Sequence, residues 1–145
     1  MASMLETLRA RLEPGGTLAR TEEAIVSLIA LHSVAIGLLL VFATDWGARF
    51  GGFGAVSPRF FARQAGAFHF VVAAVYLVEY VRYRGVLLLV LTKSVAVAFL
   101  GLTAALDHAS WLVALSGAGD AAMGLAVLLL RRARGLSLAG PAGRP

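Results

Sequence analysis

The chain has 145 residues, of which 59% are hydrophobic and 14% charged, with a formal net charge of +5. Soluble domains contain about 45–50% apolar and about 25% charged residues, and a chain of this length has no core large enough to hide the excess. Cysteine is absent, which excludes disulfides, thiolate metal sites, iron–sulfur clusters and thiol catalysis.

The first 22 residues precede the apolar blocks, and we expect them to form a separate segment at the membrane interface. Ser3 and Glu6 have the spacing of a capping box, and leucines follow at helical spacing. This pattern predicts a short amphipathic helix on the membrane surface, ended by Pro14. A cleaved signal peptide is not expected, because the next apolar block has about 20 residues, whereas a signal peptide's has about 7–15.

Four apolar blocks follow, and each is long enough to cross a bilayer. At about 1.5 Å per residue, some 20 residues cover a hydrocarbon core of roughly 30 Å. The expected helices span residues 24–43, 60–81, 85–106 and 111–130. Thr21 is the expected N-cap of the first helix, and Gly135 the expected stop of the fourth.

The connections after the second and third blocks are very short, which makes the helices they join antiparallel neighbours. The predicted fold class is therefore all-α: an integral membrane four-helix up-down antiparallel bundle over residues 23–134. Residues 44–59 read as a glycine-rich loop whose Trp46, Phe50 and Phe53 suit the headgroup boundary. The tail, residues 135–145, has too little apolar content to fold and is expected to be disordered and cytoplasmic.

Arginines predict the orientation of the bundle. One side of the membrane receives nine arginines: Arg9, Arg11, Arg20, Arg82, Arg84, Arg131, Arg132, Arg134 and Arg144. The other side receives Arg49, Arg59 and Arg63. The positive-inside rule therefore places both termini in the cytoplasm, which in a bacterium means the inner (plasma) membrane. Because the basic residues flank apolar blocks, we interpret them as topology determinants and lipid contacts, not as a nucleic-acid surface.

Each predicted span carries one ionisable residue near its centre. These residues are His32, His69, Lys93 and Asp120. From the helical rise, all four lie within roughly 4 Å of the bilayer midplane. An ionisable side chain at this depth costs about 2.5–3.5 kcal/mol, so we expect the four to face the bundle interior as one polar midplane site. Lys93 and Asp120 form the expected pair, which has either a structural role or a role in proton transfer or ligand polarisation.

Small residues predict where the helices approach closely and which faces turn inward. In the first span, Ser33 and Gly37 form a small-xxx-small pair. In the second, Gly66 lies one turn before His69. In the fourth, Ser116, Asp120 and Gly124 recur every four residues on one face.

Two midplane histidines on neighbouring helices also allow a b-type haem reading, with His32 and His69 as axial ligands. A metal site from His32, His69 and Asp120 is disfavoured, because no two of these ligands have the i, i+4 spacing of a helical metal site. We therefore expect no metal and no resident cofactor, and keep haem b or a quinone as alternatives.

The chain resembles the DoxX-like group of small four-helix membrane proteins. The likeness lies in the four-span layout, in Arg63 with Ala65 and Gly66 at the start of the second span, in Tyr76, and in Asp120 with Gly124. The resemblance implies a four-helix bundle, and some members of the group are similar to subunits of quinone-linked membrane oxidoreductases.

These observations predict an accessory or partner-binding membrane subunit, beside a quinone-linked redox complex, and not an enzyme on its own. Its expected partners are the lipid bilayer and a larger membrane complex or further copies of itself. A b-type cytochrome and a small proton-coupled transporter using Lys93 and Asp120 are the alternatives.

Overall fold

The computed structural model describes residues 16–107 and 109–140. Within them the chain forms five helices and no strand: α2 (Thr17–Phe42), α3 (Thr44–Phe50), α4 (Phe60–Tyr83), α5 (Leu87–Leu106) and α6 (Trp111–Ala133). All but the short α3 are long and apolar enough to cross a membrane. The all-α class and the four long apolar helices are therefore confirmed for this part of the chain.

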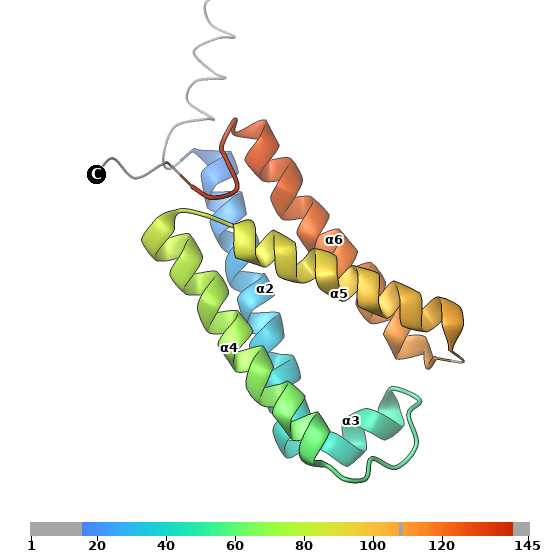
Figure 1. Ribbon diagram of the computed structural model, residues 1–145. Coiled ribbons are helices and arrows are strands. Elements are labelled where there is room, and N and C mark those ends of the chain that lie inside the picture. The colour runs from blue at the N-terminus through green and yellow to red at the C-terminus, as the bar shows by residue number, and fades with distance from the viewer. Residues whose placement is uncertain (1–15, 108, 141–145) are drawn as a thin grey trace, which may run out of the picture.

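The four long helices are arranged as two closely packed pairs. Helix α2 packs along α4 and α5 along α6, whereas contacts between the pairs, from α2 to α6 and from α4 to α5, are far fewer. Figure 1 shows the pairs meeting at the end where α2 begins and diverging towards α3. At the far end α3 reaches across, and the ring of Phe50 lies edge-on to Trp111 of α6 at 5.7 Å. The arrangement is thus a wedge between two helical hairpins.

The α2–α4 pair is held close by two glycines that face each other. A Cβ atom added to Gly66 would lie 2.9 Å from the carbonyl oxygen of Gly37, and one added to Gly37 would lie 2.7 Å from the Phe70 ring. Ser33, one turn before Gly37, is also buried. The close contact predicted for the small residues Ser33 and Gly37 of α2 is therefore confirmed.

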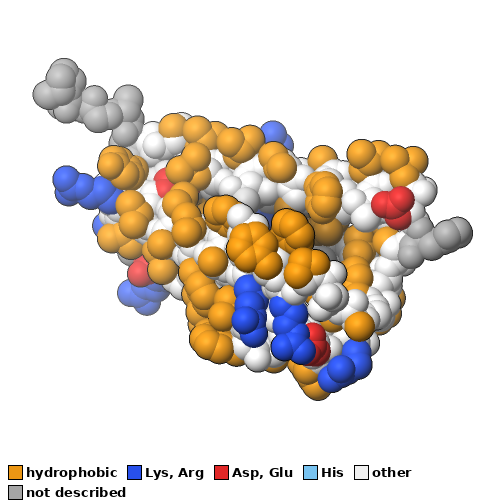
Figure 2. All heavy atoms as spheres, turned by 60° about the horizontal axis from the view of Figure 1, so that its bottom comes forward, with side chains coloured by type: hydrophobic (Ala, Val, Ile, Leu, Met, Phe, Trp, Pro, Cys, Tyr) orange, Lys and Arg blue, Asp and Glu red, His pale blue; other side chains and the backbone are white. Residues whose placement is uncertain are grey.

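The buried apolar cluster lies where the two pairs meet. Its members come from all four long helices and the α4–α5 connection: Val26, Ile29, Tyr76, Tyr80, Val86, Leu89 and Val127. Most other large hydrophobic side chains are exposed, for example Phe42 and Leu106. Figure 2 shows that hydrophobic side chains cover much of one face. Apolar area of this extent, left in water, is unfavourable, so this surface suits lipid or a protein partner.

The structure corrects the predicted start of the first span. Helix α2 begins at Thr17, with Gly16 as its N-cap, and the Thr21 hydroxyl donates to the Thr17 carbonyl at 2.9 Å within the helix. Thr21 is therefore not the cap, because the helix continues through the polar residues in front of the apolar block. Residues 17–22 belong to α2 and not to a separate segment. The expected amphipathic helix lies in residues 1–15, outside the described part.

Two other segments differ from expectation. The predicted loop over residues 44–59 begins with the seven-residue helix α3. Gly135 has a positive φ of 64° after α6, as expected of a helix stop, but the chain after it is ordered. The Val86 amide donates to the Leu138 carbonyl at 2.7 Å, and Leu138 packs on the buried cluster. Disorder was therefore wrongly predicted for residues 136–140, while residues 141–145 lie outside the described part.

Candidate functional site

The expected pair of Lys93 and Asp120 forms near the middle of α5 and α6. Lys93 Nζ donates to Asp120 Oδ1 at 2.5 Å, and the two side chains are 7% and 15% exposed. Gly124, one turn after Asp120, gives Lys93 the room to lie against α6, because a Cβ atom at Gly124 would lie 3.2 Å from Lys93 Cβ. Asp120 and Gly124 thus face α5 as predicted, whereas Ser116, the third residue of the predicted inward face, is exposed.

A pocket of about 280 Å³ opens beside this pair in the wedge between the hairpins. Every long helix contributes to its lining: Ser33, Ala65, Phe68, His69, Val72, Tyr76, Thr92, Lys93, Ala96 and Asp120. The lining combines an ion pair, an imidazole and hydroxyl groups with apolar side chains. Such a mixture can bind a partly polar group within an otherwise apolar environment.

The same ion pair borders a second hollow on the other side of the α5–α6 hairpin. This hollow has a volume of about 360 Å³ and is lined by α5 and α6 alone, including Ser94, Gly124 and the Lys93–Asp120 pair. An ion pair sealed inside a closed bundle has no such openings. Lys93 and Asp120 therefore hold α5 to α6 and border both hollows, although their side chains are largely buried.

The structure brings together three of the four predicted midplane residues. Lys93, Asp120 and the half-buried His69 line the wedge pocket, whereas His32 is exposed on α2 and is not part of the lining. The predicted inward orientation of His32 is therefore not what the structure has. Helix α2 turns Ser33 and Gly37 towards α4 instead, because only small residues fit at that contact.

These positions fit a haem poorly. Axial ligands must face one shared space, but His32 is exposed and does not line the pocket that His69 lines, and α2 and α4 pack tightly at Gly37 and Gly66. Within residues 16–107 and 109–140, no group of three or more His, Cys, Asp or Glu residues is placed to hold a metal ion.

Known proteins offer no closer guide to this site. The chain matches no family model, no curated protein and no solved structure. The geometry of the wedge and the chemistry of the residues that line it are therefore the observations that bear on its function.

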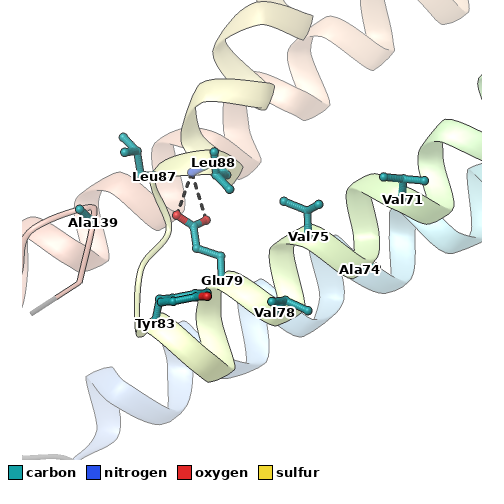
Figure 3. A pocket seen from close by; sticks show the side chains of 9 residues that line it. All are labelled: Val71, Ala74, Val75, Val78, Glu79, Tyr83, Leu87, Leu88 and Ala139. Carbon is teal, nitrogen blue, oxygen red and sulfur yellow. Dashed lines mark hydrogen bonds between the residues drawn. The ribbon is translucent and has the colours of Figure 1, made fainter. Parts of the chain in front are cut away.

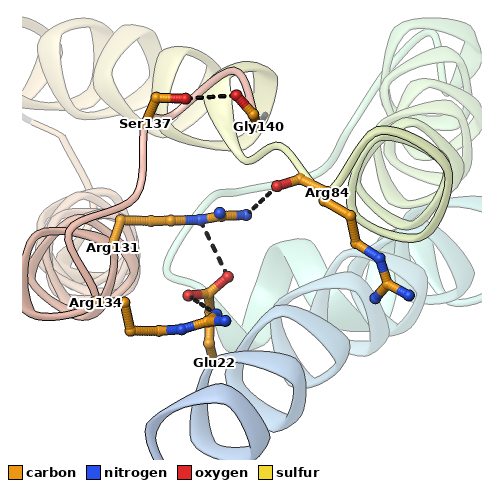
Figure 4. A network of polar contacts seen from close by, with 6 residues as sticks. All are labelled: Glu22, Arg84, Arg131, Arg134, Ser137 and Gly140. Atoms are coloured by element: carbon orange, nitrogen blue, oxygen red, sulfur yellow. Dashed lines mark hydrogen bonds and ion pairs between the residues drawn. The ribbon is translucent and has the colours of Figure 1, made fainter. Parts of the chain in front are cut away.

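Sequence reasoning missed a second charged cluster at the end where the hairpins meet (Figure 4). Glu22 of α2 is fully buried and pairs with two arginines after the apolar part of α6: Arg134 Nη1 donates to its Oε2 at 2.7 Å, and Arg131 Nε lies 3.0 Å from its Oε1. The Arg131 contact is an ion pair without hydrogen-bond geometry. Arg131 Nη2 also donates to the Arg84 carbonyl at 2.6 Å. The cluster thus ties α2, α4 and α6 together.

Glu79 of α4 makes a further link at this end (Figure 3). Both of its carboxylate oxygens accept the Leu88 amide at 3.0 Å, and Oε2 also accepts from Leu89 at 3.4 Å. Helix α5 has no side-chain cap of its own, so Glu79 caps its N-terminus from another helix. The mostly apolar groove beside Glu79, of about 600 Å³, faces outward between α4 and α5.

One signal in the sequence points to these links. Glu22 and Glu79 lie at the ends of predicted spans that share a membrane side with Arg131 and Arg134. Counting only basic residues for orientation leaves out the acidic ones at the same depth, which are the partners that allow an arginine to be buried.

Proposed function

We propose that this chain is a small integral membrane subunit whose wedge between two helical hairpins binds a transmembrane helix of a partner protein. The four long helices cross the bilayer up and down, with both termini in the cytoplasm. The observation that carries the proposal is the Lys93–Asp120 pair, which lies near the middle of two apolar helices and borders an open hollow on each side.

The energetics of that position favour a partner. Hydrocarbon offers no hydrogen bonds, so charged groups at mid-membrane are costly unless protein or trapped water surrounds them. Lys93 carries three donor hydrogens, and within the described residues its ammonium makes one hydrogen bond, to Asp120. A polar side chain of a partner helix seated in the wedge would supply the remaining acceptors and exclude lipid.

The resemblance to the DoxX-like group suggests which partner to expect. Some members are similar to subunits of quinone-linked oxidoreductases, so we propose a redox complex of that kind as the partner, with His69, Lys93 and Asp120 as the internal polar site. No specific observation favours the two alternatives, a b-type cytochrome and a proton-coupled transporter. The exposed position of His32 speaks against a cytochrome.

Purification from native membranes in a mild detergent tests the proposal. The wild-type chain is expected to elute with a larger partner, and Asp120→Asn, which breaks the ion pair, is expected to lose it. Asp107→Asn is the matched control, because Asp107 is exposed at the end of α5 and lines neither hollow. Recovery of the wild-type chain alone, as a stable monomer, would contradict the proposal.

A charge exchange separates partner binding from simple helix packing. The double variant Lys93→Asp/Asp120→Lys keeps a neutral pair between α5 and α6 but moves the cation to the other helix. If the pair only joins the helices, the variant retains the partner; if the pair forms the binding site, the variant folds and loses the partner.

A further inference from the structure

Three arginines gather at the end of the molecule opposite Glu22. Arg49 lies in the last turn of α3, Arg59 directly precedes α4 and Arg63 lies in its first turn. With Asp45 and Trp46 they line one pocket of about 370 Å³. In Figure 2, which brings this end forward, Lys and Arg side chains lie beside an acidic one in a hydrophobic surround.

The pocket has an excess of positive charge. Asp45 pairs with Arg59 through both carboxylate oxygens, with Arg59 Nε donating to Oδ1 at 3.1 Å. Arg49 and Arg63 make no ion pair or side-chain hydrogen bond with any residue the structure describes. Three guanidinium groups and one carboxylate leave a net charge of +2. The first turn of α4 contains no acidic residue, so the partial positive charge of its N-terminus adds to this excess.

Membrane topology does not account for this cluster. Under the proposed orientation, the positive-inside rule concentrates arginines at the opposite end, and these three are the ones on the unfavoured side. Arginines scattered over that side would need no explanation. All of them lie in one pocket, which places like charges near each other, and the carboxylate of Asp45 offsets only part of that charge.

We propose that this pocket binds a phosphate-bearing anion, held by Arg49 and Arg63, beside Arg59, which is paired with Asp45. Guanidinium groups match the geometry of phosphate oxygens and form charge-assisted hydrogen bonds with them. Trp46 lines the pocket and stacks on Phe50, with ring centroids 5.4 Å apart, which supplies an apolar wall. The phosphate comes either from an anionic lipid headgroup or from a free ion in solution; the lipid source rests on the proposed membrane insertion.

The fluorescence of Trp46, which lines the pocket, is expected to change when the anion binds. The chain has two tryptophans, so Trp111→Phe leaves Trp46 alone and retains an aromatic ring beside Phe50. The purified protein in neutral detergent is titrated with sodium phosphate, with sodium chloride at equal ionic strength, and with dihexanoyl phosphatidylglycerol or dihexanoyl phosphatidylcholine. A saturable change in Trp46 fluorescence with phosphate indicates a free-ion site. A saturable change with phosphatidylglycerol alone indicates a lipid site. No saturable change with either overturns the proposal.

Two sets of variants assign the binding to the pocket. Arg49→Gln/Arg63→Gln is expected to weaken binding about tenfold or more, since it removes two charge-assisted contacts. Arg20→Gln/Arg82→Gln removes two exposed arginines outside the pocket and is expected to change the affinity less than about twofold, as remote charges are screened. Equal weakening by both pairs overturns the proposal.

A gain of affinity provides a test that misfolding cannot imitate. Asp45→Asn removes the one carboxylate of the pocket and releases Arg59 from its pair, so the net charge rises and the phosphate binds more tightly. Unchanged or weaker binding by Asp45→Asn, in protein that still unfolds cooperatively, contradicts the assignment.

Discussion

At the N-terminal end of α2, Glu22 pairs with two arginines that would otherwise be largely buried without a counter-charge. Glu22 is fully buried, Arg131 is 2% exposed, and both belong to different hairpins. Removing one member of such a buried group leaves the others desolvated and unpaired, which costs far more than losing a surface ion pair. The next residue, Glu23, is also acidic but is exposed.

Glu22→Ala is therefore expected to lower the free energy of unfolding by about 3–5 kcal/mol. Glu23→Ala, its matched control, is expected to change it by about 0.5 kcal/mol or less. Unfolding by sodium dodecyl sulfate in mixed micelles measures both. Similar losses for the two variants would show that the Glu22 cluster does not join the hairpins.

At the scale of elements, two kinds of contact build the molecule. Within each hairpin, small residues bring helix axes close, as Gly37 and Gly66 do for α2 and α4. Between hairpins, the buried apolar cluster and the polar links lie together at one end, including the cap that Glu79 provides for α5. The first kind makes the hairpins stiff, and the second holds them together at one end, while at the other end the contact of Phe50 with Trp111 spans the wedge.

Gly66→Ala tests the close contact. The new Cβ atom would lie 2.8 Å from Val41 and 2.9 Å from a backbone oxygen that cannot rotate away, so α2 and α4 must separate. We expect a loss of about 1–3 kcal/mol in the free energy of unfolding. Gly119→Ala in α6 meets nothing within 4 Å and is expected to be neutral or to stabilise by about 0.5–1 kcal/mol through helix propensity. A tolerated Gly66→Ala would contradict the packing of this hairpin.

Some of this architecture follows from the sequence and some does not. Block length and hydrophobicity predict four long helices, and opposite charges at one depth predict the Lys93–Asp120 pair, because both depend on local composition. The orientation of His32 does not follow, since it depends on which helix packs beside α2. The order of residues 136–140 depends on a distant amide, that of Val86, which local polarity cannot reveal.

At the scale of the whole molecule, the open wedge is the feature on which the proposed function depends. Two stiff hairpins that meet at one end present His69, Lys93 and Asp120 to a space that all four long helices line. If a partner helix occupies that space in the membrane, residues lining it contact another protein. Neighbouring residues on the outer surface would then contact lipid instead.

Photo-crosslinking in cells tests most directly whether a partner protein occupies the wedge. Ala65 and Ala67 are both exposed alanines of α4, but only Ala65 lines the wedge pocket. With the photoreactive residue p-benzoylphenylalanine at position 65, we expect an adduct to a second protein, larger than the 15.2 kDa chain, and at position 67 we expect none. Absence of a protein adduct at position 65, or equal yields at both positions, would contradict a wedge filled by a partner.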